Sequence, residues 1–539
     1  MAAKTFLREA TGLVRALSSL DVFIATVSIV SLGGGAGATM VLLGLYPPSD
    51  IAAVYTIGLI PTVAFVVVYS IMTSAFPRSG GEYVWVSRIA GANIGFAYSW
   101  MMEFSFLFFI LAGQAWFITW VGLPSTLTGM GLILKAPYLV DWSRAITSST
   151  NLGFLVALIF LLLGGAISIL GTRNYARIQR ISWAYAMFGI VVWFALLLTS
   201  TNASFVSSFD TVMSGIASYE GIVKAARDAG LLQPISIQGT LIASIPLSWA
   251  MYSGFWYSTY MAGETKRVSR SMPIGLAAGI VFLWAFFVVF FWLSQQVFGA
   301  DFMYAMSALS AAASPAYTLP FGPSISFLVS LLTTNPIVML IASSTLIVWW
   351  FIILPPLFLA GSRVIFAWSY DRVIPARFAE VNEKFNSPII AVAVCVAANI
   401  FWAYINAYQG YYMTLLNYTL LWAVSWAIPG FVAAAFPYVK RELYNRTMSS
   451  LPSGFSRKIA GVPILTIAGL VQGIFMLYYG YAQLSPTLTY VYLSPAVVYS
   501  FGWLFGLLIV GLLYFLAVRS YRKSHGLDLN MIFREIPPE

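Results

Sequence analysis

Ser31-Leu-Gly-Gly-Gly-Ala-Gly-Ala-Thr-Met40 is the stretch that decides the fold, and it lies inside the first long apolar segment of the chain. Glycine occupies four of the five positions 33–37. A glycine in a helix interior costs about 1 kcal/mol relative to alanine, and packing through small residues needs them three or four positions apart. The run therefore favours a break in the first spanning helix, with one half ending near Leu32 and the next beginning near Ala38.

A break at mid-membrane has a chemical use. Unwound backbone exposes N–H and C=O groups, which the hydrocarbon region tolerates only where protein buries them or where they line a polar cavity. The first N–H groups of the second half-helix would point at an anionic group of a ligand. The alternative is that the glycines only allow neighbouring helices to pack closely.

The composition is typical of polytopic helical membrane proteins. Of 539 residues, 60% are hydrophobic and 9% are charged, with a mean hydropathy of +0.85, whereas a soluble domain has about 25% charged residues. The first apolar segment is too long for a signal peptide, so we expect it to remain as a span. Runs of roughly 20 apolar residues predict an all-α protein with twelve transmembrane helices, at residues 18–44, 51–74, 93–122, 151–170, 181–200, 238–263, 273–298, 335–369, 388–407, 411–436, 462–483 and 496–518.

The basic residues predict the orientation of the chain. With a cytoplasmic N-terminus, 24 Lys and Arg fall on the cytoplasmic side and four fall outside, at Lys135, Arg144, Lys224 and Arg227. This asymmetry follows the positive-inside rule, so the net charge of +10 reflects topology and contact with anionic lipid rather than nucleic-acid binding. We expect a multi-pass protein of the cytoplasmic (plasma) membrane. The segments 1–17, 438–461 and 519–539 are expected in the cytoplasm and the loop 201–237 outside.

Several chemistries are excluded by residue counts. The only cysteine is Cys395 and the only histidine is His525, so neither a disulfide within the chain nor a zinc, copper or paired haem site is expected. No nucleotide-binding GxxxxGK[ST] motif occurs. We therefore expect no enzyme, no metal and no cofactor, which leaves a transporter, a channel or a structural subunit. Nothing resembles the carbonyl rings of a selectivity filter, which disfavours a channel.

A second break is predicted in the span 238–263. Pro246-Leu-Ser-Trp-Ala-Met-Tyr-Ser-Gly-Phe255 contains Pro246 and the pair Ser253 and Gly254, which interrupt the span near its outer part and its centre. Transporters with inverted repeats carry such breaks at matching positions of the two halves. The alternative is a proline kink with ordinary packing.

Four motifs resemble those of the amino acid–polyamine–organocation (APC) transporters. They are Phe76-Pro-Arg-Ser-Gly-Gly-Glu-Tyr-Val-Trp85, similar to the family's P-x-x-G-G-x-Y loop; Gly171-Thr-Arg-Asn-Tyr-Ala-Arg-Ile-Gln179, similar to the start of its fifth helix; Gly254-Phe255 through Ala262-Gly-Glu264-Thr-Lys266 to Arg270 and Pro273, similar to its sixth-helix signature; and Ser362-Arg363-Val-Ile-Phe-Ala367 with Asp371-Arg-Val-Ile-Pro375 and Pro388, similar to the end of its eighth helix. The resemblance implies a LeuT-type 5+5 inverted repeat. Residues 18–200 would form helices 1–5, residues 238–437 helices 6–10, and residues 462–518 helices 11 and 12, with helices 1 and 6 broken.

The resemblance also implies a substrate site at the two breaks. Gly35-Ala36-Gly37 occupies the family position whose backbone holds a substrate carboxylate, and the broken sixth helix would offer carbonyl groups to a substrate ammonium. Trp249 and Tyr252 are candidate aromatic gates, with lipid-facing or packing bulk as the alternative. The full set of substrate-binding candidates is Gly33, Gly34, Gly35, Ala36, Gly37, Trp249, Ala250, Met251, Tyr252, Ser253 and Gly254.

Charged residues near the cytoplasmic ends of the spans are candidates for an ion-pair gate. A solvated, topology-setting role is the alternative, because exposed pairs contribute only about 0–1 kcal/mol. On the outer loop, Asn202-Ala-Ser204 is a possible glycosylation acceptor. The gate candidates are Arg78, Glu82, Arg88, Glu264, Lys266, Arg363 and Asp371.

Two acids lie within the predicted spans. Asp21 is at the inner edge of the first span, where a solvated or capping role is expected. Glu103 is near mid-depth in the third span, where an ionisable group is functional by default. We expect Glu103 to carry a coupling proton or to pair with a cationic substrate group; the alternative is a neutral packing carboxyl.

Sodium coupling is disfavoured. LeuT-type sodium carriers use hydroxyl groups near mid-depth of the eighth helix, where this chain reads Ile352-Ile-Leu-Pro-Pro356, and the hydroxyls of Ser343, Ser344 and Thr345 lie too far outward. Some proton-linked members of the family that this chain resembles carry a lysine in the fifth helix, where this chain has Ala186. Ala186 cannot take the role of that lysine.

The sequence thus favours a secondary active transporter that moves amino acids or related amines by alternating access, coupled to protons or working by exchange. The alternative is a non-transporting membrane subunit or sensor with the same fold. The expected partners are a small-molecule substrate and membrane lipid, with no nucleic acid, and the chain is expected to be a monomer or homodimer.

Overall fold

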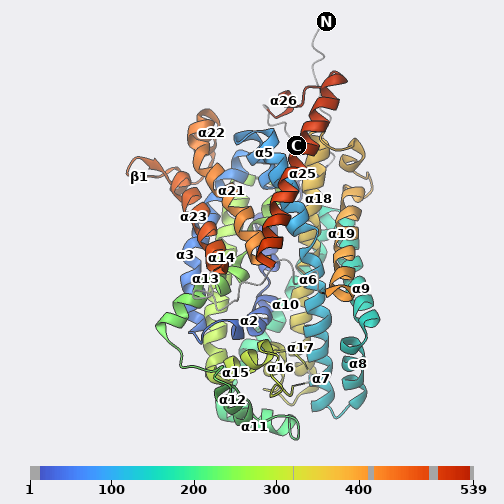
Figure 1. The fold of residues 1–539 in the computed structure, drawn as a ribbon, viewed down its shortest axis with the longest axis vertical. Coiled ribbons are helices and arrows are strands. Elements are labelled where there is room, and N and C mark those ends of the chain that lie inside the picture. The colour runs from blue at the N-terminus through green and yellow to red at the C-terminus, as the bar shows by residue number, and fades with distance from the viewer. Residues whose placement is uncertain (1–12, 320, 411–417, 485–495, 534–539) are drawn as a thin grey trace.

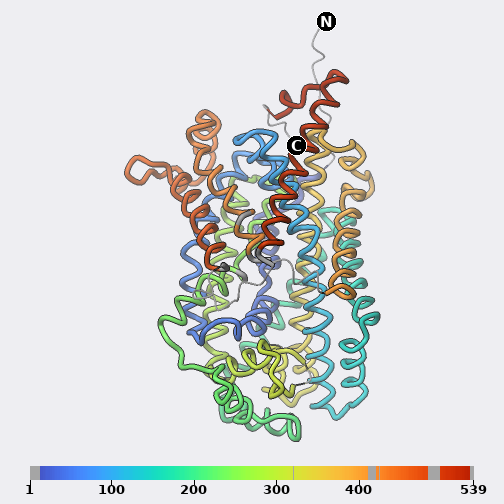
Figure 2. Tube along the Cα trace, viewed as in Figure 1, coloured from blue at the N-terminus to red at the C-terminus, as the bar shows by residue number. Residues whose placement is uncertain are grey.

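A computed structural model describes residues 13–319, 321–410, 418–484 and 496–533 as a bundle of long helices (Figures 1 and 2). In these ranges, 11 helical segments are long and apolar enough to cross a membrane. They match eleven of the twelve predicted spans, although residues 411–417 of the predicted span 411–436 lie outside the described part. The segments are Ser19–Leu45, Ile51–Ala75, Ala92–Ile133, Thr150–Ile169, Thr172–Thr199, Val268–Ala311, Pro336–Tyr370, Ile389–Tyr408, Leu420–Val439, Ile464–Ala482 and Val498–Ser524.

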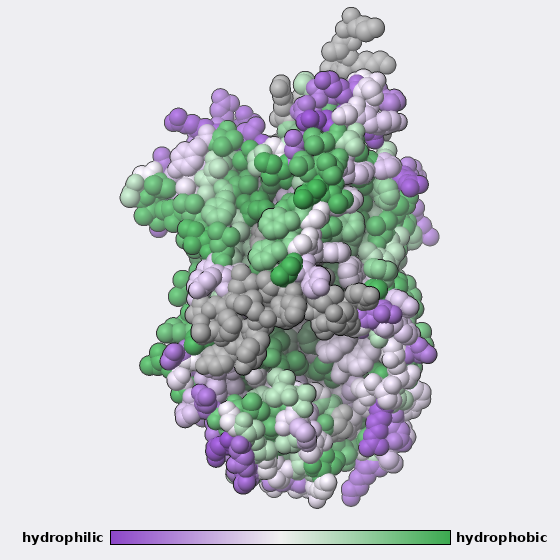
Figure 3. Space-filling view, viewed as in Figure 1, coloured by the Kyte–Doolittle hydropathy of each residue, from purple (hydrophilic) through white to green (hydrophobic). Residues whose placement is uncertain are grey.

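Most of these segments are continuous helices or begin with one. On the face drawn in Figure 3, hydrophobic residues form much of the coloured surface between the two ends of the bundle, and many of the hydrophilic residues lie toward those ends. Bilayer lipid would face this surface, since a chain crossing the hydrocarbon core must expose apolar side chains there. The helices are α3 (Ile51–Ala75), α9 (Thr150–Ile169), α10 (Thr172–Thr199), α14 (Val268–Ser294), α19 (Ile389–Tyr408), α21 (Tyr418–Val439), α23 (Ile464–Leu484) and α25 (Ala496–Ser524).

The first span is broken at Ser31, between α1 (Ser19–Val30) and α2 (Leu32–Leu42), which is followed by the short turn η1 (Leu43–Leu45). Ser31 adopts φ 66° and ψ 104°, and its Oγ accepts a hydrogen bond from the N–H of Gly34 at 3.1 Å. Serine is favoured at such a helix N-cap. A break in this span is therefore confirmed, but its predicted place, with a second half beginning near Ala38, is wrong.

The glycine run lies inside α2 and allows close packing. A Cβ on Gly33 would come within 2.5 Å of Trp349 Cδ1, and one on Gly37 within 2.6 Å of Leu346 Cδ1. Real Cβ atoms do not come this close, so only glycine lets α2 approach the helix that carries Trp349. The interpretation that the glycine run unwinds the helix is therefore wrong: the break is at Ser31, and the glycines allow close packing.

The predicted span 238–263 is also broken. It consists of α13 (Ile237–Tyr252) and the 3₁₀ segment η4 (Phe255–Glu264), joined by Ser253 and Gly254. Gly254 has φ +89°, a left-handed conformation that favours glycine. Pro246 lies within a continuous α13 and does not interrupt it. Neither piece alone is long enough to cross a membrane, which explains eleven spanning segments where the sequence predicted twelve.

Two further spans change direction or pitch. The segment Pro336–Tyr370 is divided into α17 (Pro336–Phe351) and α18 (Leu354–Tyr370) just before Pro355 and Pro356. The third span contains two π-helical turns, which often occur at functional sites, and it extends well past the predicted end at residue 122. Its parts are α5 (Ala92–Met102), η2 (Glu103–Leu107), α6 (Ile110–Phe117), η3 (Ile118–Gly122) and α7 (Leu123–Ile133).

Shorter elements cover the two ends of the bundle. The predicted outer loop 201–237 contains the helices α11 (Asn202–Val212) and α12 (Tyr219–Asp228). At the same, lower end of Figure 1 lie α8 (Pro137–Ser148), α15 (Ala300–Ala311), which follows η5 (Gln295–Gly299), and α16 (Ile325–Ser330). The upper end carries α4 (Glu82–Ile89), η6 (Ala376–Ala379), α22 (Arg441–Ser450), η7 (Ser453–Ser456), the hairpin β1 (Lys458–Ile459) and β2 (Val462–Pro463), and α26 (Leu529–Ile532).

The upper end is named the basic end here, because the segments 76–91, 264–272, 371–388 and 440–463 that lie there hold many of the basic residues. Leu17, just before α1, forms a β-bridge with Thr265, just after η4. Phe533, just after α26, stacks beside Arg88 of α4. The first and last described segments therefore lie at the same end of the bundle.

Candidate functional site

A cavity of about 140 Å³ lies where the two broken helices meet. An engineered protein cavity of about this size admits benzene, so the space suits a small organic molecule. The lining residues come from α1, α2, η2, α6, α13, η4, α17, α18, α21 and the residues that join them, far apart in the sequence. They are Ile29, Val30, Gly34, Gly35, Ala38, Leu42, Phe106, Ile110, Gln114, Phe117, Met251, Ser253, Gly254, Tyr257, Trp350, Ile353, Leu357 and Trp422.

The ends of two half-helices border this cavity. The N-terminus of α2 contributes Gly34 and Gly35, and the C-terminus of α13 contributes Met251 and Ser253. A helix N-terminus carries a partial positive charge and a C-terminus a partial negative one. The cavity therefore has an anion-favouring side and a cation-favouring side, without an Asp, Glu, Lys or Arg among the described residues that line it.

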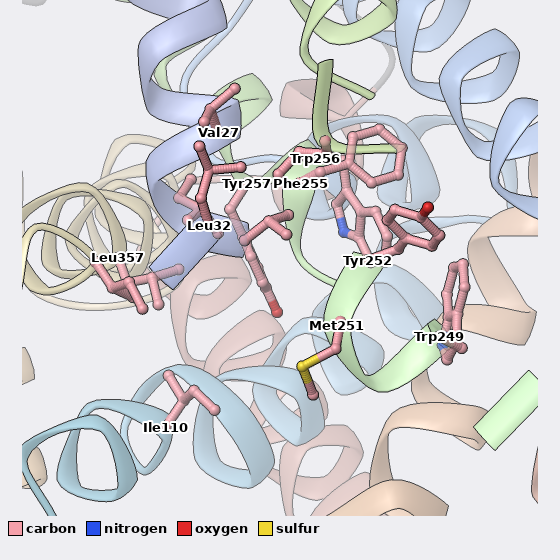
Figure 4. Packing of buried hydrophobic residues seen from close by; sticks show 14 of the residues in the cluster. Val27, Leu32, Ile110, Trp249, Met251, Tyr252, Phe255, Trp256, Tyr257 and Leu357 are labelled. Atoms are coloured by element: carbon pink, nitrogen blue, oxygen red, sulfur yellow. The ribbon is translucent and has the colours of Figure 1, made fainter. Parts of the chain in front are cut away.

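The side chains in the cavity are mostly apolar. Figure 4 shows Met251, Ile110 and Leu357 around the central space, with the Tyr257 hydroxyl group pointing towards it. Gln114 is half-buried, and its side chain makes no hydrogen bond within the part of the chain that the structure describes. Its amide is the one polar side chain that α6 contributes to the lining.

Five of the predicted substrate residues line the cavity: Gly34, Gly35, Met251, Ser253 and Gly254. The others do not. Trp249 points away from it (Figure 4) and packs on Phe65, with ring centres 4.5 Å apart, and the Tyr252 hydroxyl donates to the Tyr55 carbonyl at 3.1 Å. Gly33, Ala36 and Gly37 are buried against neighbouring side chains, and the side chain of Ala250 lies outside the described residues.

Sequence reasoning missed the contribution of the third span. Phe106, Ile110, Gln114 and Phe117 follow one another at intervals of three or four residues, so they share one helix face. That face contains Gln114, a polar residue within an apolar span. This residue could have indicated from the sequence that the face lines a cavity. Ser31 was also missed, although serine directly before a helix is a recognised cap.

At the basic end, Asp371 joins two arginines from the P-x-x-G-G-x-Y loop and α4. An Nη of Arg88 lies 2.7 Å from Asp371 Oδ2, and an Nη of Arg78 lies 3.5 Å from Oδ1. All three side chains are buried. Burial by itself would raise the pKa of Asp371, but the guanidinium groups of Arg88 and Arg78 hold that pKa below its ordinary value.

A second buried ion pair joins η4 to α18. Arg363 Nε lies 2.7 Å from Glu264 Oε1 and Nη2 lies 2.9 Å from Oε2, so the pair is bidentate. Thr172, at the start of α10, donates its hydroxyl to Glu264, and the backbone N–H groups of Ala16 and Leu17 donate to the Glu264 carbonyl. This cluster, defined by Glu264, Arg363 and Thr172, connects four separate segments.

Two gate candidates are not in these ion pairs. Lys266 is exposed and forms no ion pair among the described residues. Glu82 is buried and accepts a hydrogen bond from the Tyr69 hydroxyl at 2.5 Å instead of pairing with an arginine. Burial raises the pKa of Glu82 more than the Tyr260 and Tyr69 hydroxyls lower it.

Glu103 begins the π-helical turn η2 and is fully buried, 0% exposed. It does not line the central cavity. A Cβ on Gly361 of α18 would come within 2.9 Å of Glu103 Oε1 and 3.1 Å of Cys395 Sγ, so the missing side chain at Gly361 makes room for the carboxyl group. Neither carboxyl oxygen has a hydrogen-bond partner within the described residues.

Three further predicted residues can be placed. Asp21 forms a capping box with Ser18 at the start of α1 and a bidentate ion pair with Arg180, whose Nε lies 2.7 Å from Asp21 Oδ1. Because Asp21 is only 6% exposed, the predicted capping role is confirmed and the predicted solvated role is wrong. Asn202 is exposed and donates its amide to the Val297 carbonyl. Ala186 is buried, and its carbonyl accepts from the Trp349 indole at 3.2 Å.

Comparison with known protein families shows the family to which the chain belongs. The model of a family described as amino acid permease matches residues 17–512. This range includes every residue that lines the central cavity and both buried ion-pair clusters. No curated protein matches the chain. The chain belongs to the amino acid permease family of the APC superfamily.

Proposed function

We propose that this protein is a secondary active transporter that moves amino acids across a membrane by alternating access. The observation that carries the proposal is the pair of half-helix ends, α2 and α13, at one cavity. Their partial charges match the carboxylate and ammonium groups that every amino acid carries. Because the lining between them is apolar and uncharged, the substrate proposed is an amino acid with a small uncharged side chain.

The two breaks also support the LeuT-type arrangement. In that arrangement α13 and η4 together form the sixth of twelve spans, and the five-helix halves are inverted. The proposed topology places both termini and the basic end in the cytoplasm of a cell whose plasma membrane holds the protein, because 24 of 28 basic residues would then lie inside. The chain is proposed to act as a monomer or homodimer.

Closure of one side of the membrane is supported by the ion pairs at the basic end. The Glu264–Arg363 pair and the Asp371 cluster are buried, and each includes an acid from the segments at the basic end. Breaking them would open a route from the cytoplasm to the cavity. The described conformation is therefore proposed to be the inward-closed state of the transport cycle.

Proton coupling is proposed to use Glu103. A carboxyl group buried at this depth is costly and functional by default. Its place outside the cavity favours a proton-carrying role over direct pairing with a cationic substrate group. Sodium coupling is not proposed, because Ile352 and Ile353, which separate α17 from α18, carry no hydroxyl groups.

The test is uptake by the purified protein in proteoliposomes, measured for a panel of radiolabelled amino acids and polyamines. An Ala38→Phe variant should block uptake, because Ala38 lines the cavity. Ala517→Phe is the matched control, since Ala517 is exposed on α25. Uptake that Ala38→Phe leaves intact would place the substrate elsewhere.

The alternative function is a non-transporting subunit or sensor that keeps the fold. The half-helix ends at the cavity disfavour it, because a structural subunit has no need of breaks in two spans that meet at one cavity. Absence of uptake across the whole panel, together with saturable binding of one of its members by calorimetry, would support a sensor.

A further inference from the structure

A second, much smaller cavity of about 10 Å³ lies between Glu82 and Glu103. Roughly 10–15 Å³ of such space is what one water molecule needs, together with two to four polar partners. Tyr98 and Tyr260 also line the cavity. Its size and its polar lining therefore suit a single water molecule.

The polar atoms around this cavity lack partners. Both carboxyl oxygens of Glu103 and Oε2 of Glu82 have no hydrogen bond within the described residues, and neither has the hydroxyl of Tyr98. Oε1 of Glu82 is satisfied by Tyr69. Burying an unpaired carboxylate is so costly that the group takes up a proton instead. A shared proton and a bridging water would satisfy these atoms together.

The same two elements contribute residues to both cavities. Phe106 and Tyr257 are stacked, with ring centres 5.4 Å apart and planes 10° apart, and both line the central cavity. Leu107 and Tyr260, on the same two elements, line the small cavity. Movement of η2 or η4 during transport would therefore displace lining residues of both cavities.

We propose that Glu82 and Glu103 form a two-carboxyl proton site in which one water molecule relays a single proton between them. The inference rests on the proton coupling proposed above and adds the second carboxyl group and the route. Protonated Glu103 gives its proton to the water, and the water gives another of its protons to Oε2 of Glu82. Glu103 becomes a carboxylate, Glu82 becomes a carboxylic acid, and the pair keeps one negative charge throughout.

The surrounding groups leave these two acids free to exchange a proton. The acidic groups at the basic end are already paired with guanidinium groups, Glu264 with Arg363 and Asp371 with Arg88. The remaining neighbours on the packed elements are weak acids with high ordinary pKa values. These neighbours are Tyr69 of α3, Tyr83 of α4, Tyr98 of α5, Tyr260 of η4 and Cys395 of α19.

Infrared spectroscopy of the purified protein tests the shared proton directly, with protons alone as the ligand. The variants are Glu82→Gln, Glu103→Gln and the double variant, and Glu383→Gln is the control because Glu383 is exposed at the basic end. We expect a protonated-carboxyl band that each single variant shifts and the double variant removes. A Glu103 band with unchanged frequency and pH titration in Glu82→Gln would overturn the relay.

Transport separates this inference from the proposed coupling. Uptake is measured with the amino acid of the panel that is taken up best. Glu82→Gln should lower the uptake driven by a pH gradient by about a hundredfold or more, the lower end of what a positioned acid–base group contributes, and should leave exchange unchanged. Full gradient-driven uptake by Glu82→Gln would overturn the relay alone. A wild-type protein insensitive to the gradient would overturn the coupling itself, and the infrared result would still decide whether the proton is shared.

A conservative variant distinguishes proton transfer from packing. Tyr69→Phe removes only the hydroxyl group that donates to Glu82. Because that donor lowers the pKa of Glu82, its loss should move the pH midpoint of the infrared band upward. An unchanged midpoint with an intact fold would show that Glu82 does not titrate at this site.

Discussion

The hydroxyl of Ser31 donates a hydrogen bond to the carbonyl oxygen of Trp349 at 2.9 Å, and so ties the break in the first span to α17. The Oγ of Ser31 also accepts a hydrogen bond from the N–H of Gly34 and so caps α2. One side chain thus fixes both the position of the break and its orientation towards the helix behind it.

Ser31→Ala should destabilise the protein by about 0.5–2 kcal/mol, the usual cost of losing a helix N-cap. It should also weaken substrate binding, because α2 would begin less sharply at the cavity. The measurements are thermal unfolding and the concentration dependence of uptake. Ser28→Ala is the matched control, since the buried Ser28 hydroxyl one turn earlier has no partner within the described residues. Equal effects of the two variants would contradict the role of the cap.

Arg363→Ala should destabilise the protein by about 3–5 kcal/mol, because Glu264 would be left as a buried charge without its partner. It should also expose Cys395, the only cysteine of the chain, to a membrane-impermeant thiol reagent from the basic end. The double variant Glu264→Gln with Arg363→Met leaves neither charge buried, so much of the stability should return. Slow labelling of Cys395 in Arg363→Ala would show that the pair does not close this end.

The sequence predicted the spans well because their signal is hydrophobicity, which the membrane imposes on every residue of a span. It placed the first break incorrectly because glycine has two uses. Gly33 and Gly37 lack a side chain, which lets α2 pack against Trp349 and Leu346. Only the positions of those bulky partners reveal this use. The break at Gly254 was predictable, since a left-handed residue there needs glycine.

The candidate site was harder to predict than the fold. Half-helix ends could be located from the sequence, but the walls of the cavity come from Phe106, Tyr257 and Trp422 on three separate elements. Similarly, the sequence shows Glu82 only as one of several charged residues in the segment 76–91. What distinguishes its carboxyl group is that Tyr69 and the small cavity lie next to it. Such relations depend on tertiary packing, which one sequence does not contain.

The stability of the basic end should depend on pH through two acids whose pKa values are shifted in opposite directions. The pKa of Asp371 is below its ordinary value, so its stabilisation is complete above pH about 4 and is lost only as the pH falls through the lowered pKa. The pKa of Glu82 is raised, so its protonated form is favoured in the folded protein and stability falls as the pH rises through its ordinary pKa towards the raised one.

Thermal unfolding between pH 8 and pH 4 checks this assignment. Wild-type protein should become more stable as the pH falls across the range in which Glu82 takes up a proton. Glu82→Gln should flatten this response, whereas Asp371→Asn should lower stability at every pH in the range without changing the slope. A flat wild-type profile, or a slope that Glu82→Gln leaves intact, would contradict the assignment to Glu82.

Phe533 covers the Arg88–Asp371 ion pair from the C-terminal side of the chain. The Arg88 guanidinium carbon lies 4.9 Å from the centre of the Phe533 ring, which is 6% exposed and packs edge-on against Tyr83 and Phe515. A cation–π contact of this kind contributes about 0.5–2 kcal/mol, more when it is shielded from water.

Phe533→Ala should therefore weaken closure of the basic end and speed labelling of Cys395 by roughly two- to thirtyfold. Phe533→Trp keeps an aromatic face over Arg88 and should retain slow labelling, whereas Phe533→Leu keeps the apolar bulk alone. Labelling of the leucine variant at the wild-type rate would show that Phe533 acts only as a hydrophobic cover and that its contact with the Arg88 charge contributes nothing to closure.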